Sequence, residues 1–196
     1  MQNNYLESVR KQFEYYKLLG ERTMAQLSDE DLFWQYNAES NSIAVIVKHL
    51  WGNMLSRWTD FLTADGEKQW RDREAEFESD IRDRNELRRR WEAGWNCLFE
   101  ALDSVDEENF GTTVYIRNQG HTIVEAINRQ LAHYAYHVGQ VVYIGRMIKG
   151  VEWESLSIPK GQSKAYNLEK FSQPKRQEHF TQEFLHGESP DETPKG

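Results

Sequence analysis

Three histidines have the residue type and the spacing of a metal site. His133 and His137 are four residues apart, so on a helix their imidazoles lie on one face, about 6 Å apart along the axis. His49 comes much earlier in the chain, and a facing helix would bring it opposite the pair. Three neutral imidazoles can bind one divalent metal and leave a coordination position open for water or substrate, which is typical of a catalytic site.

The same histidines also have a purely structural interpretation. Imidazoles in a polar core layer donate hydrogen bonds to carbonyl groups or to tyrosine hydroxyls. The pair is not the metallopeptidase motif, because that motif requires a glutamate directly after the first histidine, and Tyr134 occupies that position. A di-iron carboxylate centre is not indicated either, since Glu-x-x-His pairs do not line two helices. From the residues alone, the metal site and the polar core layer both stay open.

The composition argues against several classes of function. The chain has 196 residues and a formal net charge of −8 at pH 7, whereas a general nucleic-acid-binding protein needs a basic surface. Its one cysteine, Cys97, cannot form an intrachain disulfide, and we interpret it as a buried, inert thiol. No apolar run reaches about 18 residues, and the N-terminus lacks the pattern of a signal peptide. We therefore expect a cytoplasmic protein that binds neither nucleic acid nor membranes.

Four segments have the apolar periodicity of long helices. The sequence predicts them at residues 5–27, 43–62, 85–104 and 123–149. The last segment is apolar on more than one side, which is typical of a central, buried helix. Its start, with Thr122 and Glu125, has the spacing of a capping box. His49 and Asn53 flank the apolar stripe of the second segment, so we expect them to face inward or to line a pocket.

The rest of the chain predicts a short excursion and a tail. Residues 112–116 are β-branched and aromatic, and a turn signal follows at residues 118–120, so a short extended excursion or hairpin is expected there. From Gln173 onward, three of the four prolines appear. We therefore predict one bundle domain at residues 1–172 and a C-terminal tail at residues 173–196, either flexible or packed on a partner subunit.

Over about residues 5–150, the chain resembles the DinB/YfiT-like superfamily. The resemblance rests on Ser42-Ile43, on His49-Leu50, and on a late helix with His133, His137 and then Gly139-Gln140. The later segment at residues 158–163, with the sequence IPKGQS, is similar to a bacterial subfamily of unassigned function within that superfamily.

The resemblance implies an all-α fold, namely a four-helix bundle with an up-up-down-down type connection and a C-terminal extension, assembled as a homodimer. It also implies a divalent metal bound by the residues that match the family's ligands, His49, His133 and His137. Zinc or nickel is expected first, with iron or manganese as alternatives. Relatives include thiol S-transferases and isomerases that use low-molecular-weight thiols such as bacillithiol or mycothiol, while many others have no known reaction.

The leading functional hypothesis is a metal-dependent enzyme that transfers a low-molecular-weight thiol to a small-molecule electrophile. A metal bound by three neutral imidazoles keeps its positive charge and binds a thiol as thiolate at neutral pH. No catalytic residue is assigned, but Asn53, Arg57 and Gln130 are candidate substrate-binding residues, one to two helical turns from the ligands. A metal-dependent hydrolase, a non-catalytic metal-binding or ligand-sensing dimer, and a helical bundle without metal are the alternatives.

Overall fold

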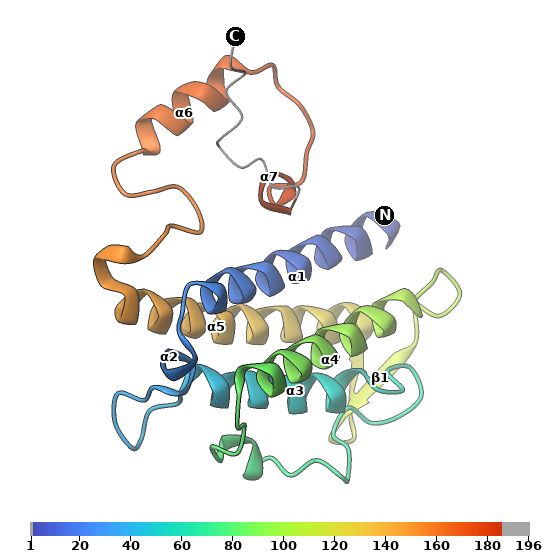
Figure 1. The fold of residues 1–196 in the computed structure, drawn as a ribbon. Coiled ribbons are helices and arrows are strands. Elements are labelled where there is room, and N and C mark those ends of the chain that lie inside the picture. The colour runs from blue at the N-terminus through green and yellow to red at the C-terminus, as the bar shows by residue number, and fades with distance from the viewer. Residues whose placement is uncertain (1, 186–196) are drawn as a thin grey trace.

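The computed structural model describes residues 2–185 and is mostly helical, as predicted (Figure 1). The helices are α1 (Gln2–Ala25), α2 (Asp29–Phe33), α3 (Ile43–Trp58), α4 (Arg84–Asp103), α5 (Ile123–Lys149), α6 (Ser163–Ser172) and α7 (Gln182–Leu185). Two short 3-10 helices, η1 (Ala75–Phe77) and η2 (Gly150–Glu152), and two strands, β1 (Thr113–Ile116) and β2 (Gln119–Thr122), complete the described elements. Across residues 2–185, none of the helices combines the length and the apolar character needed to cross a membrane.

The four long helices α1, α3, α4 and α5 pack together as a bundle (Figure 1). The start of α1 meets the start of α5, where the Tyr5 hydroxyl donates a hydrogen bond to the Asn128 side chain at 2.8 Å. Near the other end of both helices, Thr23 lies beside Gly145. Contacts that advance together along two helices mean that the helices are parallel, so α1 and α5 run in the same direction.

Helices α3 and α4 are also parallel to each other, and they run opposite to α1 and α5 (Figure 1). Arg90 lies over the Trp51 ring near one end, and Cys97 lies 3.6 Å from the Thr59 hydroxyl at the other. The order of directions is therefore up-down-down-up, and the up-up-down-down connection implied by the resemblance is wrong. This order needs only one long crossover, between the parallel α3 and α4, and residues 59–83 supply it.

The centre of the bundle is an aromatic cluster with one ring from each long helix. Phe13 of α1 lies between 5.9 and 6.4 Å, centroid to centroid, from Trp58 of α3, Trp95 of α4 and Tyr134 of α5. All four side chains are buried, and the Trp58 indole N–H donates to the Tyr134 hydroxyl at 2.9 Å. Tyr134 is the residue of α5 that packs in this cluster, and it directly follows His133 in the chain.

The predicted ends of the long helices lie within three residues of those in the structure, except at the end of α3. Residues 123–149 form α5 as predicted, whereas α3 ends at Trp58 instead of continuing to residue 62. The chain leaves the helix because Thr59 is extended and Asp60 adopts a left-handed φ of 51°. The apolar periodicity runs past the helix end because Phe61 packs on the Trp58 ring from the turn, with 4.9 Å between the centroids.

The predicted excursion before α5 is an antiparallel hairpin of β1 and β2. Its turn lies at Arg117 and Asn118, with φ values of 57° and 60°. The observed turn therefore begins one residue before the predicted turn at residues 118–120. A two-residue hairpin loop favours positive φ at both central positions. The hairpin ends at Thr122, which forms the predicted capping box with Glu125 and starts α5.

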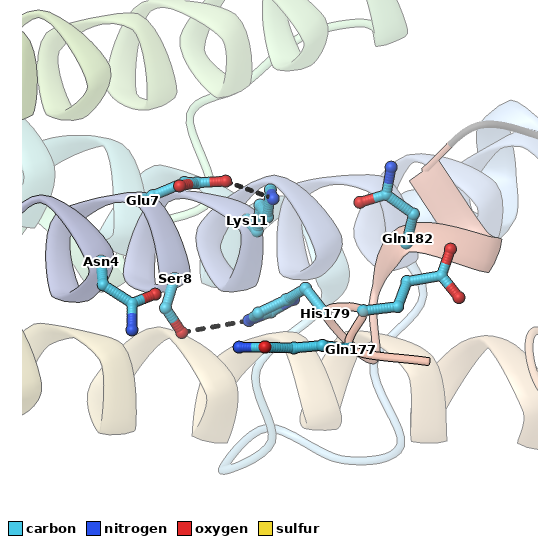
Figure 2. A pocket seen from close by; sticks show the side chains of 8 residues that line it. Asn4, Glu7, Ser8, Lys11, Gln177, His179 and Gln182 are labelled. Carbon is cyan, nitrogen blue, oxygen red and sulfur yellow. Dashed lines mark hydrogen bonds and ion pairs between the residues drawn. The ribbon is translucent and has the colours of Figure 1, made fainter. Parts of the chain in front are cut away.

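The described part of the C-terminal tail returns to α1 of the same chain, whereas α6 stands away from the bundle (Figure 1). Phe184 packs against Tyr15 of α1 at 5.2 Å between ring centroids. His179 Nε2 lies 3.1 Å from the Ser8 hydroxyl, beside a polar cavity between α1 and the tail (Figure 2). The boundary at residue 172 and a contact with a partner subunit stay predictions, and residues 186–196 lie outside the described range.

Candidate metal centre

Two helices of the bundle supply the three histidines. Ser42 is the N-cap of α3, the helix that carries His49, and its hydroxyl accepts the Val45 N–H at 3.2 Å. α5 carries His133 and His137 on one face. Because α3 and α5 are antiparallel, the middle of α5 faces the middle of α3, and the predicted convergence of the three imidazoles is confirmed.

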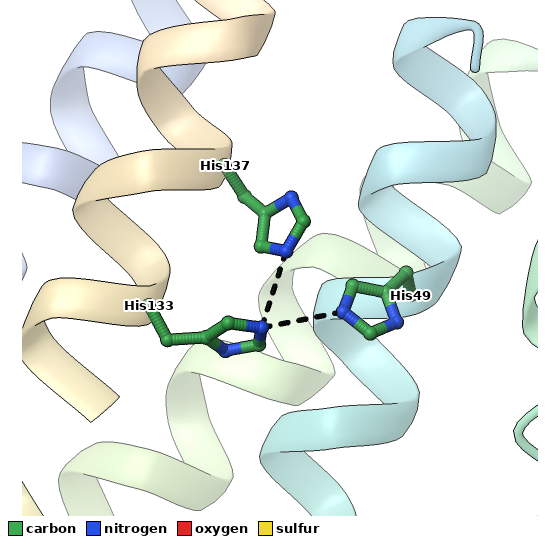
Figure 3. Close-up of side chains that lie close together, drawn as sticks. All are labelled: His49, His133 and His137. Atoms are coloured by element: carbon green, nitrogen blue, oxygen red, sulfur yellow. Dashed lines mark hydrogen bonds between the residues drawn. The ribbon is translucent and has the colours of Figure 1, made fainter. Parts of the chain in front are cut away.

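The three imidazoles point their Nε2 atoms toward one another (Figure 3). His133 Nε2 lies 3.4 Å from His49 Nε2 and 3.1 Å from His137 Nε2. One ligand atom from each ring lies within 4.8 Å of the other two. Nitrogen ligands of a tetrahedral zinc ion, at about 2.05 Å from the metal, are about 3.3 Å apart. The donor type and the spacing therefore fit one divalent metal ion, and the three histidines could hold it.

A buried ion pair orients His49. Its Nδ1 lies 2.8 Å from Glu76 Oε2, and Arg71 donates two hydrogen bonds to the Glu76 carboxylate, at 2.7 and 2.9 Å. Burial by itself would raise the pKa of Glu76, but the hydrogen bonds from His49 and Arg71 and the Arg71 charge outweigh it and place the pKa below its usual value. An ionised Glu76 accepts the Nδ1 proton of His49, so the Nε2 lone pair faces the cluster.

The other two histidines differ in what their Nδ1 atoms contact. His137 Nδ1 lies 2.8 Å from Gln140 Oε1, and the Gln140 amide in turn donates to the Tyr136 hydroxyl at 3.2 Å. The His133 Nδ1 atom is buried and has no hydrogen-bond partner among residues 2–185. In the same range, none of the three imidazoles hydrogen-bonds a backbone carbonyl or a tyrosine hydroxyl. This pattern counts against the polar core layer as their role.

The electrostatics of the cluster keep its half-buried histidines neutral. Burial above all, together with the neighbouring His137 and His49, lowers the pKa of His133 to about 3. Burial also lowers the pKa of His137, although the hydrogen bond with Gln140 acts in the opposite direction. Metal ligands must be deprotonated, so both rings are in the binding form at neutral pH.

One side of the cluster is close to exposed aromatic rings. Phe77 stacks on the His49 ring at 5.0 Å between centroids, and Tyr136 packs against His137 at 4.9 Å. Phe77 is 42% exposed and Tyr136 is 63% exposed, and His133 is only partly buried. Aromatic surface beside the cluster is therefore exposed to solvent.

The three predicted substrate-binding residues lie in the buried polar layer behind the cluster. Asn53 Oδ1 accepts a hydrogen bond from the Tyr134 hydroxyl at 3.1 Å. The Arg57 guanidinium donates to Glu67 at 3.1 Å and also to a backbone carbonyl. Gln130 Oε1 is buried without a partner among residues 2–185. A role for these residues in substrate binding stays a prediction.

The side chains that orient the ligands were not predicted from the sequence. Gln140 follows His137 by three residues, and this helical spacing was a signal that could have identified it. Arg71 and Glu76 lie on the crossover between α3 and α4, within a polar stretch that has no distinctive motif. Only the path of the crossover brings Glu76 to His49.

Comparisons with known proteins identify one family. A family model described as a protein of unknown function, DUF1572, matches residues 1–162, and the match ends directly before α6. Neither the curated proteins nor the solved structures give a significant match. The matched region contains the whole bundle and all three histidines. The chain therefore belongs to the DUF1572 family.

Proposed function

We propose that this protein is a metal-dependent enzyme of the DinB/YfiT-like superfamily, with one divalent metal held by His49, His133 and His137. The observation that carries the proposal is the convergence of three Nε2 atoms from two helices. The side-chain acceptors at the Nδ1 atoms of His49 and His137 support it, because ligating histidines usually donate their other ring N–H to such a group. The bundle fold and the motifs shared with that superfamily also support it.

The reaction we propose is the transfer of a low-molecular-weight thiol to a small electrophile. When bound, the divalent metal would lower the pKa of the thiol and so supply a thiolate at neutral pH. In this transfer the thiol proton passes to solvent, the sulfur bonds to the electrophilic atom, and the leaving group departs with the bonding electrons. Phe77 and Tyr136 offer exposed ring surface to an apolar part of either reactant.

The environment of Glu76 favours thiol transfer over hydrolysis. A hydrolase commonly uses a carboxylate near the metal as general base for water. Within residues 2–185, Glu76 is the carboxylate that contacts the cluster, and its two oxygens are occupied by His49 and Arg71. A thiol needs no such base once its pKa is lowered, so the arrangement suits a sulfur nucleophile better.

The first test is the metal content of the protein, purified without chelator or affinity tag and measured by mass spectrometry. The wild type is expected to hold about one metal ion per chain, and the His133→Ala/His137→Ala variant is expected to hold none. His121→Ala is the matched control, because His121 lies in β2 outside the cluster. Absence of metal from the wild type, even after incubation with zinc and with nickel, would contradict the proposal.

A second test separates the two reactions. The metal-loaded protein is incubated with a panel of low-molecular-weight thiols and electrophiles, and in parallel with amide and ester substrates. We expect loss of free thiol and formation of the S-conjugate, which the double histidine variant does not catalyse. Hydrolysis without thiol transfer would overturn the transferase assignment and leave the metal site intact.

A further inference from the structure

The three imidazoles of the cluster differ in the hydrogen-bond partner of their Nδ1 atom. His49 Nδ1 contacts Glu76, and His137 Nδ1 contacts Gln140, both at 2.8 Å. His133 Nδ1 is buried and has no partner within residues 2–185. When His133 binds metal through Nε2, its Nδ1 must carry a proton, and a buried N–H without an acceptor is unfavourable.

An unused acceptor lies one helical turn away on the same helix. Gln130 precedes His133 by three residues on α5, and residues at this spacing are neighbours on a helix face. Helical side chains lean toward the N-terminus, so the His133 ring leans toward the turn that holds Gln130. Gln130 is 3% exposed, and its Oε1 has no partner. It is the one buried side-chain oxygen without a hydrogen bond among the described residues.

The neighbouring acceptors in this layer are already in use. Asn53 Oδ1 accepts from the Tyr134 hydroxyl, and Glu67 Oε2 pairs with Arg57. Both oxygens of Glu76 are engaged by His49 and Arg71. The donor that competes for Gln130 is Arg57 Nε, which also lacks a partner, and both residues line one small cavity.

We propose, on the basis of the metal site proposed above, that Gln130 is the positioning residue of His133. Its Oε1 accepts the His133 Nδ1–H after a rotation of the Gln130 side chain. Each of the three ligands then has a side-chain acceptor: Glu76 for His49, Gln140 for His137 and Gln130 for His133. Gln130 thus acts on the metal through His133, and not on the substrate.

The test compares zinc affinities by competition with a chromophoric chelator. Gln130→Leu is expected to bind zinc about 10- to 100-fold more weakly than the wild type. Gln130→Glu keeps an acceptor and is expected to restore most of the affinity. Gln140→Leu is the positive comparison, and Arg129→Leu is the matched control, since Arg129 is an exposed neighbour on the same helix. Thermal unfolding of the metal-free variants shows whether the loss is confined to metal binding.

A spectroscopic measurement identifies the hydrogen bond itself. In zinc-loaded protein labelled with ¹⁵N-histidine, the His133 Nδ1 proton is expected to be downfield and protected from exchange. Gln130→Leu should shift it and expose it to solvent, whereas Arg57→Lys should leave it unchanged. Should Gln130→Leu fail to fold, the wild-type spectrum decides, because a rapidly exchanging His133 Nδ1 proton would overturn the proposal.

The outcomes separate this proposal from the proposed function. A wild type that binds no zinc overturns the metal site and, with it, the role of Gln130. A wild type that binds zinc, together with a Gln130→Leu variant that binds equally well and keeps the His133 signal, overturns only the role of Gln130. A His133 signal that responds to Arg57→Lys would also overturn it, since Arg57 would then be the group that holds the Gln130 carbonyl.

Discussion

Gly52 leaves room for the carboxylate that holds His49. Gly52 follows His49 by three residues on α3. A Cβ at this position would lie 2.9 Å from the Glu76 carboxyl carbon and still closer to one of its oxygens. Glu76 is also fixed by Arg71, so it cannot move away without breaking a buried ion pair. The geometry of the metal ligand therefore depends on a residue without a side chain.

At the residue scale we predict that Gly52→Ala weakens zinc binding by about 10- to 100-fold, because it displaces the acceptor of the His49 Nδ1 proton. Gly139→Ala is the matched control: Gly139 is on α5, and its Cβ would meet no atom within 4 Å. That variant should keep its zinc affinity and gain about 1 kcal/mol in free energy of unfolding. Chelator competition measures the zinc affinities, and chemical denaturation measures the free energies of unfolding. Equal zinc affinities of Gly52→Ala and the wild type would contradict the prediction.

Glu76, which orients His49, lies on the crossover between α3 and α4. Asp65 of the same crossover binds the turn of the hairpin. The Asp65 carboxylate accepts backbone N–H groups of Glu67, Arg117 and Asn118 at 2.7 to 2.8 Å. Burial acts to raise the pKa of Asp65, but these hydrogen bonds outweigh it and lower the pKa below its ordinary value of 3.8. The crossover and the hairpin are therefore joined by an ionised side chain.

At the element scale we predict that Asp65→Asn lowers the thermal midpoint at neutral pH. Because the folded pKa of Asp65 is depressed, its stabilisation is fully present above the unfolded pKa and is lost as the pH falls through the folded pKa. The midpoint difference between the wild type and the variant should stay constant near neutral pH and narrow below pH 3.8. Thermal unfolding across this range tests it, and a difference that persists in strong acid would refute it.

On the scale of the whole molecule, α6 makes few contacts within residues 2–185, where Tyr166 and Lys170 bond the Glu183 carboxylate of α7. It stands away from the bundle (Figure 1), and Leu168 and Phe171 are 73% and 83% exposed. An isolated helix of this length is marginal in water. The outer face of α5 also leaves Tyr143 and Met147 exposed. We expect a second copy of the chain to cover these exposed side chains in the predicted homodimer.

We therefore predict a dimer in which α6 packs on the partner subunit. Light scattering coupled to size-exclusion chromatography should give twice the chain mass for the wild type. Leu168→Asp/Phe171→Asp should give the monomer mass, because it introduces charges into an apolar contact. Glu169→Lys, an exposed change on the same helix, should stay dimeric. A monomeric wild type, or a double Asp variant that remains a dimer, would contradict this assignment.

The sequence by itself determined the long helices and the histidine pair, because both depend on interactions within a few residues. α5 agrees with its prediction at both ends, where Thr122 forms a capping box and Gly150 adopts a positive φ of 54°. His133 and His137 share a face because of helical spacing alone. Phe13 and the other rings of the central cluster all lie in the four segments whose apolar periodicity predicted helices.

Only the tertiary structure decided what surrounds those residues. His49 and His133 are 84 residues apart in the chain, and His49 and Glu76 are 27 residues apart, so no local periodicity relates them. The directions of α3 and α4, and the end of α3 at Trp58, depend on how the crossover folds back over the bundle. Helix propensity and capping act along the chain, whereas the ion pair that orients a ligand forms only when packing brings separate elements together.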